Sequence, residues 1–306
     1  MSAPRLRSLR ALALALGGCA SGCLPVDTRP PPATVLVTVS GSAGVRSGIP
    51  SASMSDGWSV TFDRFLVAIG ESSLERDSCT PYSDAGYRRV IDAQQPAPQK
   101  LSQLFGLGTC GVSFQVRNPE QGTLLGVGVT EQELALMLTP GGDAYAPSSG
   151  ISMLVRGRAT KGASTKTFSW TFRTPRLSYV DCAPTPGADP LVLTLVGSEA
   201  LTLGVELHGE ALFQDQLDPA KAKLWFGPFA DADDKTGNAD GEVTLDELGN
   251  VTLESLGVSP AAPPTGDAGV PTWTTFEDFV YLGLFPQIPR LTGGGACTVT
   301  AGRRRG

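Results

Sequence analysis

The sequence is poor in the side chain that most hydrolytic and zinc chemistry requires. Its 306 residues include a single histidine, His208. Acyl transfer and zinc catalysis generally need a histidine held by defined partners. His208 is followed by Glu210, a pair that could hold a metal ion or act as a base. A lone imidazole at the end of a strand is more often a hydrogen-bonded structural residue.

The common catalytic and nucleotide-binding motifs are also missing. The chain contains no Gly-x-Ser-x-Gly elbow and no P-loop, and Gly106-Leu-Gly108 lacks the third glycine and the following helix of a dinucleotide fingerprint. Paired carboxylates for glycoside cleavage could exist, but the sequence singles out no pair. We therefore predict no catalysis, and a hydrolase with unnamed residues is left only as an alternative.

Long hydrophobic runs are absent, and the one conspicuous run lies at the N-terminus. Arg5, Arg7 and Arg10 precede the run 11–16, and Cys19 and Cys23 follow it. This pattern resembles a bacterial lipoprotein signal peptide, because the run is shorter than the roughly 20 residues that span a bilayer. The resemblance implies that residues 1–22 contain a signal peptide, that the chain is cleaved before Cys19 or Cys23, and that a membrane anchor is added to that cysteine.

Two cysteines compete for lipidation. Cys19 has the preferred leucine, Leu16, three residues before it, whereas Cys23 is preceded by the better small residues. Cleavage before Cys23 would leave an even number of further cysteines, and cleavage before Cys19 would leave Cys23 over. We lean to Cys19, and both remain open.

Loss of the leader makes the chain strongly acidic. The basic count falls from 24 to 21 against 30 acids, so the net charge changes from −6 to −9. Nucleic acid is therefore an unsuitable partner. The arginines at 303–305 belong to a short basic tail, residues 298–306, that does not reverse this balance. Residues 24–33, with three consecutive prolines, are expected to form a stiff tether between membrane and domain.

The other four cysteines are widely spaced: Cys79, Cys110, Cys182 and Cys297. In an oxidising compartment such cysteines form disulfides more often than metal sites. Three pairings are possible. We favour Cys79–Cys110, which closes a local loop, and Cys182–Cys297, which ties the end of the chain to the β domain.

Short runs of alternating apolar and polar residues fill the middle of the chain. They predict strands at 35–39, 58–62, 64–69, 112–116, 151–159, 166–172, 191–195 and 201–207. Residues 160–165 suit the turn of a hairpin, and 131–138 reads as a short helix after Thr130. These features predict a mainly β fold, an antiparallel β-sandwich or barrel over residues 34–213.

Residues 214–297 are expected to carry short helices that pack on this β domain. The aromatic residues Trp273, Phe276, Phe279, Tyr281 and Phe285 include a helical three-to-four spacing, which favours core packing over a ligand platform. The helix is expected near 274–282. Trp225, Phe226 and Phe229 precede an acidic segment and are expected to anchor it to the sheet.

That acidic segment orders oxygen ligands around a glycine. With Gly241 at position 6 of a calcium loop, Asp240, Glu242, Thr244 and Glu247 fall at positions 5, 7, 9 and 12. The segment resembles a single EF-hand or dockerin-type loop across about residues 218–253. The resemblance implies a bound Ca²⁺.

The front half of the loop has two possible registers. A contiguous loop puts Thr236 and Asn238 at positions 1 and 3, which gives a weak site. An insertion instead puts Asp231 and Asp233 there and surrounds the ion with four carboxylates. We favour the inserted register. We also expect an incoming helix capped by Asp218, with Pro219 at its first position, and an outgoing helix that begins at 245.

A second, fainter similarity is to periplasmic copper-binding lipoproteins associated with methanobactin uptake. It depends on the N-terminal signal, on the run that begins at Arg64, on Gly108-Thr-Cys110 and on His208 ahead of Leu-Phe. Copper sites prefer soft or imidazole donors. Beyond Met1 the chain offers three separate methionines, Met54, Met137 and Met153.

The sequence thus predicts an exported, lipid-anchored calcium-binding protein of the cell envelope, at the periplasmic face or the cell surface. The calcium would be structural, and the protein would have a binding or interaction role. The alternative is a metal-delivery or uptake accessory that uses His208. The expected partners are calcium and the membrane, without nucleic acid, and the sequence names no protein partner.

Overall fold

Long strands that pair over most of their length dominate the structure. The computed structural model describes residues 30–82, 85–141, 145–146, 148–258 and 273–301, and this described part is mainly β, with 41% strand and 20% helix. The mainly β class is therefore confirmed, and the curled sheet is compatible with a sandwich or barrel. The expected signal peptide, most of the tether, and residues 302–306 lie outside the described residues.

The strands are β1 (Ala33–Gly41), β2 (Ser59–Glu75), β3 (Cys79–Pro81), β4 (Ala85–Asp92), β5 (Gln99–Val116), β6 (Leu124–Leu125), β7 (Met153–Lys161), β8 (Ser164–Phe172), β9 (Leu177–Val180), β10 (Leu193–Leu195), β11 (Ala200–Leu207), β12 (Glu242–Val243), β13 (Pro289–Leu291) and β14 (Thr298–Ala301). The helices are α1 (Ala43–Ser47), α2 (Glu131–Leu138), α3 (Gly227–Asp231), α4 (Leu245–Gly249) and α5 (Phe276–Asp278). Short 3₁₀ and π turns are η1 (Ser51–Ser53), η2 (Gly209–Phe213), η3 (Ala232–Thr236), η4 (Glu254–Leu256), η5 (Phe279–Leu284) and η6 (Phe285–Gln287).

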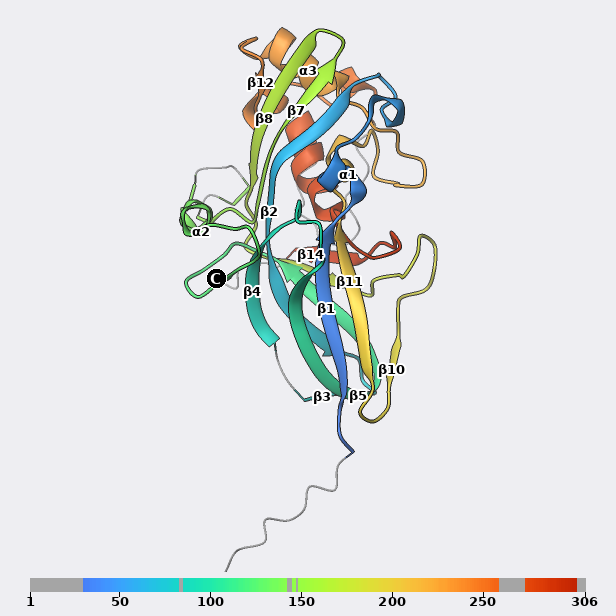
Figure 1. Cartoon of the computed structure of the whole chain (residues 1–306). Helices are drawn as coiled ribbons and strands as arrows, with labels where there is room; N and C mark the ends of the chain where they lie inside the picture. The colour runs from blue at the N-terminus through green and yellow to red at the C-terminus, as the bar shows by residue number, and fades with distance from the viewer. Residues whose placement is uncertain (1–29, 83–84, 142–144, 147, 259–272, 302–306) are drawn as a thin grey trace, which may run out of the picture. The chain divides into compact units, whose positions relative to one another are not determined.

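One strand, β5, belongs to both halves of the sheet. Its residues 99–110 pair with β1, β3 and β10, and its residues 111–116 pair with β2 and β9. The main path of the sheet runs β12-β8-β7-β2-β5-β1-β11-β13. In Figure 1 the β7–β8 hairpin, β12 and α3 lie at one end, and β3 and β10 lie at the other.

Antiparallel pairing dominates, as predicted, but three pairs are parallel. They are β1 with β11, β4 with β6, and β12 with β8. A parallel partner must return by a long connection instead of a tight turn, and β1 and β11 are separated by most of the sheet in the sequence. The sheet is therefore mixed, whereas we expected an antiparallel sandwich or barrel.

The predicted hairpin and the predicted helix after Thr130 are both present. Strands β7 and β8 pair from Met153↔Phe172 to Lys161↔Ser164, so the turn is shorter than the expected 160–165. Helix α2 begins with a capping box: the Thr130 hydroxyl accepts a hydrogen bond from the Glu133 amide, and the Glu133 carboxylate accepts one from the Thr130 amide.

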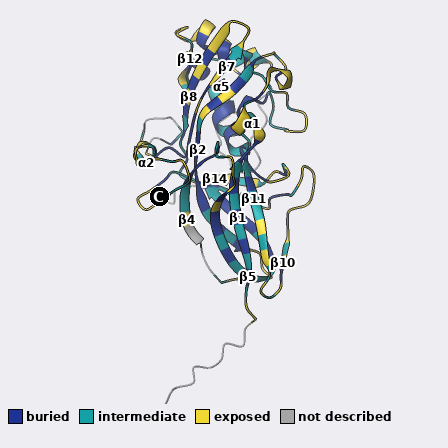
Figure 2. Cartoon of the chain, viewed as in Figure 1, coloured by how far each residue is buried: buried dark blue, intermediate teal, exposed yellow. Residues whose placement is uncertain are grey.

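The expected helix near 274–282 is also found, with different ends. Thr275 caps α5, and the chain continues as the π-helical turn η5 to Leu284. The aromatic cluster of this region is buried, as predicted: Trp273, Phe276, Phe279, Tyr281 and Phe285 all lie in the main core (Figure 2). These side chains are part of the packing and form no exposed platform.

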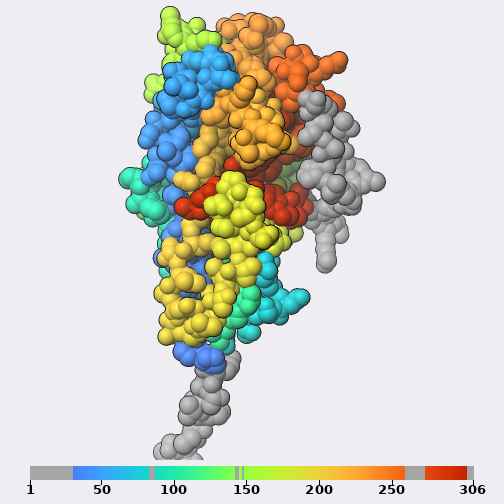
Figure 3. All heavy atoms as spheres, turned by 90° about the vertical axis from the view of Figure 1, so that its right-hand side faces the viewer, coloured from blue at the N-terminus to red at the C-terminus, as the bar shows by residue number. Residues whose placement is uncertain are grey.

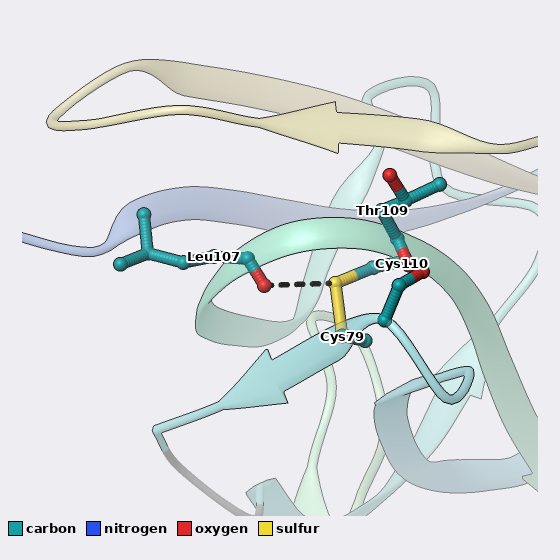
Figure 4. The surroundings of a disulfide bond; sticks show 5 residues. Cys79, Leu107, Thr109 and Cys110 are labelled. Carbon is teal, nitrogen blue, oxygen red and sulfur yellow. Dashed lines mark hydrogen bonds between the residues drawn. A yellow bond between two sulfur atoms is a disulfide. The ribbon is translucent and has the colours of Figure 1, made fainter.

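Both predicted disulfides are present. Cys79 is bonded to Cys110 and Cys182 to Cys297. Figure 4 shows the first, which joins β3 to the bend of β5, with the Leu107 carbonyl oxygen 3.6 Å from Cys110 Sγ. The second ties the segment after β9 to the segment before β14.

The sheet continues past residue 213, where we expected the β domain to end. Strands β12, β13 and β14 pair with β8, β11 and β9. Strand β14 also takes up the first residues of the expected basic tail. Among the described residues, no helix is long and apolar enough to cross a membrane.

Candidate functional site

The acidic segment lies at the end of the β7–β8 hairpin, between α3 and α4. In Figure 3 the orange surface of this part of the chain covers the upper end of the visible face. The outgoing helix is found where predicted, as α4. The prediction of an incoming helix at Asp218 is wrong. The residues after Asp218 form only a turn, in which the Ala222 amide donates to the Asp218 carbonyl.

The chain is extended beyond that turn because it pairs with neighbours. Leu224 forms isolated β-bridges to both Gln214 and Met54. A residue of the expected helix therefore pairs as in a strand. The first helix begins later, at α3, where the Asp56 carboxylate accepts the amides of Phe226 and Gly227. As predicted, Phe226 and Phe229 are buried, and Phe229 stacks on Trp170 of β8.

Asp233 is the centre of the acidic segment. Its side chain is fully buried. One carboxylate oxygen accepts the Asp240 amide at 3.1 Å, and the other accepts the Gly241 amide at 3.0 Å. These are the amides of expected loop positions 5 and 6, so Asp233 holds the turn at Gly241, whose φ of +89° suits glycine.

The same carboxylate binds a lysine from the sheet. Lys166 of β8 places Nζ 2.5 Å from Asp233 Oδ2 and 2.7 Å from Asp234 Oδ1. Burial by itself would raise the pKa of Asp233, but the ammonium and the two amides outweigh it and lower that pKa. Burial would lower the pKa of Lys166, and the two carboxylates raise it. Both groups are therefore charged at neutral pH.

Glu247, the expected ligand at loop position 12, is turned towards the backbone. Its Oε2 accepts the amide and the hydroxyl of Thr244 in a capping box, and its Oε1 accepts the Asn238 amide. This carboxylate therefore closes the start of α4 and the turn before it. Such a role needs no ion.

The remaining expected ligands point in other directions. Asp231 pairs with Lys235 on the exposed surface at 2.8 Å. Asp240 accepts the Glu242 amide and the Asn238 side-chain amide. Glu242 is exposed, and its backbone belongs to β12.

These contacts test whether the segment suits calcium. Ca²⁺ takes six to eight oxygen ligands around one point, whereas here the carboxylates bind a lysine, a second lysine and several amides. Nowhere in the described ranges do three or more acidic, histidine or cysteine side chains form a group able to hold a metal. The arrangement of Asp231, Asp233, Asp240, Glu242, Thr244 and Glu247 does not fit a calcium ion, and calcium binding stays a prediction from the sequence.

His208, the basis of the rival metal reading, lies between two glutamates. Its Nδ1 is 2.9 Å from Glu210 Oε1, and its Nε2 is 3.1 Å from Glu206 Oε2. The other oxygen of Glu210 accepts the Ser42 hydroxyl at 2.6 Å. Nδ1 is hydrogen-bonded to Glu210, whereas Nε2 is buried beside Glu206 without a hydrogen-bond partner. Among the described residues, the imidazole and these two glutamates form no group able to hold a metal. Glu210 stands between Ser42 and His208, which is not the order of a nucleophile and its base.

Burial and hydrogen bonding act in opposite directions on Glu210. Burial would raise its pKa, but hydrogen bonds from His208 and Ser42 outweigh this and lower it. Arg290 of β13 lies near the same carboxylate, and burial lowers the pKa of its guanidinium. A hollow of about 600 Å³ lies beside Glu210, walled by α1, η1 and the start of β2 with Ile49, Val60 and Leu224.

The methionines do not supply a soft metal site either. Met54 and Met153 are buried in the main core, and Met137 packs in a separate small cluster under α2. They are apolar packing residues.

The residues that sequence reasoning missed are Lys166, Glu206 and Ser42. A signal for Lys166 does exist: in β8 the buried residues alternate, and Lys166 falls in the series with Phe168, Trp170 and Phe172. A lysine on the buried face of a strand needs a carboxylate partner. Comparisons with protein families, with curated proteins and with solved structures give no match to this chain.

Proposed function

We propose that the protein is exported, anchored to a membrane of the cell envelope by a lipid, and acts by binding and not by catalysis. The anchor is inferred from the basic, apolar and cysteine-containing N-terminal pattern. The observation that carries the proposal is the pair of disulfides. Disulfides persist in oxidising compartments outside the cytoplasm.

The disulfides also narrow the choice of lipidated residue. They use Cys79, Cys110, Cys182 and Cys297, so only Cys19 and Cys23 are left for an acyl chain. Labelling of cells with a fatty-acid probe, combined with mass spectrometry of the processed N-terminus, tests this directly. We expect the label to enter the membrane fraction and to be lost in the Cys19→Ser variant, with Cys23→Ser as the matched control. A protein that keeps residues 1–18, or that carries no acyl chain, would refute the anchor.

The hollow beside Glu210 supports the binding role. It combines one carboxylate with apolar walls, which suits a ligand with an apolar body and a cationic or hydroxyl group. Chemical-shift mapping with short alkylammonium ions tests this site. Shifts around Gly44 and Ile49 that disappear in Glu210→Gln support it, and shifts that survive this change count against it.

The metal-delivery alternative loses support because His208 and its neighbouring glutamates, among the described residues, form no group able to hold a metal. Calcium as a structural ion stays a hypothesis from the sequence, since the carboxylates do not converge. Its test belongs with the lysine described next.

A further inference from the structure

We propose that the ammonium of Lys166 is the built-in cation of the segment 231–247, so that the order of this segment and its pairing to the sheet depend on Lys166 and not on a divalent ion. This inference is independent of the lipid anchor and of the binding role. It arises from the mismatch between a calcium-like sequence pattern and the contacts that its residues make.

Lys166 places a positive charge beside the buried carboxylate of Asp233. Its Nζ contacts Asp233 Oδ2 and Asp234 Oδ1, and the Lys166 side chain is only 10% exposed while that of Asp233 is completely covered. A buried carboxylate requires a cation or hydrogen-bond donors to remain charged. Lys166 supplies the cation, and the amides of Asp240 and Gly241 supply the donors.

The contact links the turn to the sheet. Lys166 lies on β8 next to Thr167, whose amide donates to the Gly241 carbonyl at 2.8 Å. The next residues of the loop form β12, which pairs parallel with β8. The indole Nε1 of Trp170 then donates to the Val243 carbonyl at 2.8 Å. The ammonium, the turn and the short strand therefore form one connected unit on β8.

A calcium ion could not be added to this unit as it stands. It would have to lie beside the ammonium, a like charge, and it would find Glu247 already bound to the Thr244 and Asn238 amides. The carboxylates of the segment are instead bound by amides and by two lysines, Lys166 and Lys235.

The experiment compares wild type with Lys166→Met by thermal unfolding and by hydrogen exchange of the peptide that contains Asp240 and Gly241. Removal of one partner of a buried ion pair leaves an unpaired charge, so we expect the melting temperature to fall by about 6–10 °C. We expect exchange in residues 237–244 to accelerate about tenfold or more. Lys235→Met is the matched control. It breaks an exposed lysine–aspartate pair in the same segment and should change the melting temperature by about 2 °C or less.

A measurement with and without calcium tests whether the segment depends on Lys166 or on Ca²⁺. Wild type is measured in 5 mM CaCl₂ (a condition of roughly millimolar calcium, as weak extracellular sites require) and in chelator. We expect equal melting temperatures and equal exchange in both. An increase of more than about 3 °C with calcium, or slower exchange at 237–244, would overturn the proposal, because an ion that binds only the folded protein must stabilise it.

A double variant keeps the test decisive if Lys166→Met does not fold. Lys166→Met with Asp233→Asn removes both charges, while the asparagine oxygen can still accept an amide. The double variant should be more stable than Lys166→Met alone. If it is no more stable, or if Lys166→Met behaves as wild type, the lysine does not serve as the cation.

Discussion

At the residue scale, a forked ion pair joins helix α2 to the sheet. Arg64 of β2 donates to both carboxylate oxygens of Glu133, at 2.6 and 2.7 Å, and also to Asp92. The Arg64 hydrogen bonds, aided by Thr130 and opposed by burial, lower the pKa of Glu133 to about 2. Since this pKa is depressed in the folded state, the stabilisation is complete above the ordinary pKa near 4.5 and is lost as the pH falls towards 2.

A partly exposed forked ion pair contributes about 1 kcal/mol to the free energy of unfolding. We therefore expect the melting temperature of Glu133→Gln at pH 7 to be roughly 2–4 °C below that of wild type. The difference from wild type should shrink as the pH is lowered from 4.5 to 2.5, because the unfolded wild-type chain then binds a proton at Glu133 that the folded protein does not yet bind. Circular dichroism melts across this range provide the measurement. Glu131→Gln, which changes an exposed glutamate two residues earlier in the same helical turn, is the control. A gap that stays constant with pH would contradict the assignment.

Single residues were the least predictable part of the site. Asp240, Glu242 and Glu247 stand out by their spacing from Gly241, yet spacing along the chain does not say which donor a carboxylate will meet. The decisive partner, Lys166, lies 67 residues before Asp233 in the sequence. Only the alternation of β8 marks it as inward-facing, and that alternation does not name the carboxylate it will find.

At the scale of single elements, the bend of β5 depends on a close approach of two backbones. Gly108 has a φ of +93°, and a Cβ at this position would lie 2.2 Å from the Ser78 carbonyl oxygen. Any side chain would push β3 away from β5 beside the Cys79–Cys110 disulfide. The bend that lets β5 serve both halves of the sheet thus requires glycine here.

We expect Gly108→Ala to lower the free energy of unfolding by more than about 2 kcal/mol, since it combines an unfavourable φ with a backbone clash. Gly197→Ala is the matched control: Gly197 has a φ of +64°, but nothing lies within 4 Å of its added Cβ. It should lose only about 1 kcal/mol. Urea unfolding of the two variants measures both. If both variants lose the same free energy of unfolding, the close approach of Gly108 to the Ser78 carbonyl does not contribute to the loss.

Elements with a complete local signal were predicted well. Helix α2 carries its own capping box, and the β7–β8 hairpin carries alternating strands with a polar turn. The helix expected at Asp218 failed because pairing of Leu224 with distant residues outweighs a local start signal. The parallel pairs could not be predicted, since no local pattern records which distant strand will lie alongside.

At the scale of the whole molecule, the two disulfides close loops of very different length. The cysteines of Cys79–Cys110 are 31 residues apart, and those of Cys182–Cys297 are 115 apart. Loop-closure entropy in the unfolded chain grows slowly with this separation. The longer loop should therefore add about 1 kcal/mol more stability than the shorter one, on the chain-entropy model.

The prediction is that the double variant Cys182→Ser/Cys297→Ser has a lower melting temperature than Cys79→Ser/Cys110→Ser, by roughly 2–4 °C. Differential scanning calorimetry of both, with wild type under oxidising conditions, gives the comparison. The reverse order would mean that local packing at the β5 bend outweighs the entropy of the longer loop.

The disulfide pairing could be predicted from the sequence because four cysteines allow only three pairings. In one of these, the first two cysteines close a local loop and the last two tie the end of the chain to the β domain. The β class followed from alternation over many short runs. The membership of β12, β13 and β14 in the sheet did not, because two- to four-residue strands leave too little pattern to read.

The strand that directly follows the tether has neighbours on both sides. Strand β1 begins at Ala33 and is hydrogen-bonded along its length to β5 on one edge and to β11 on the other (Figure 1). A pull exerted through an N-terminal anchor would act along the axis of this interior strand. It would have to shear two ladders at once instead of peeling an edge strand away bond by bond. The strand nearest the proposed anchor is thus a mechanically resistant part of the fold.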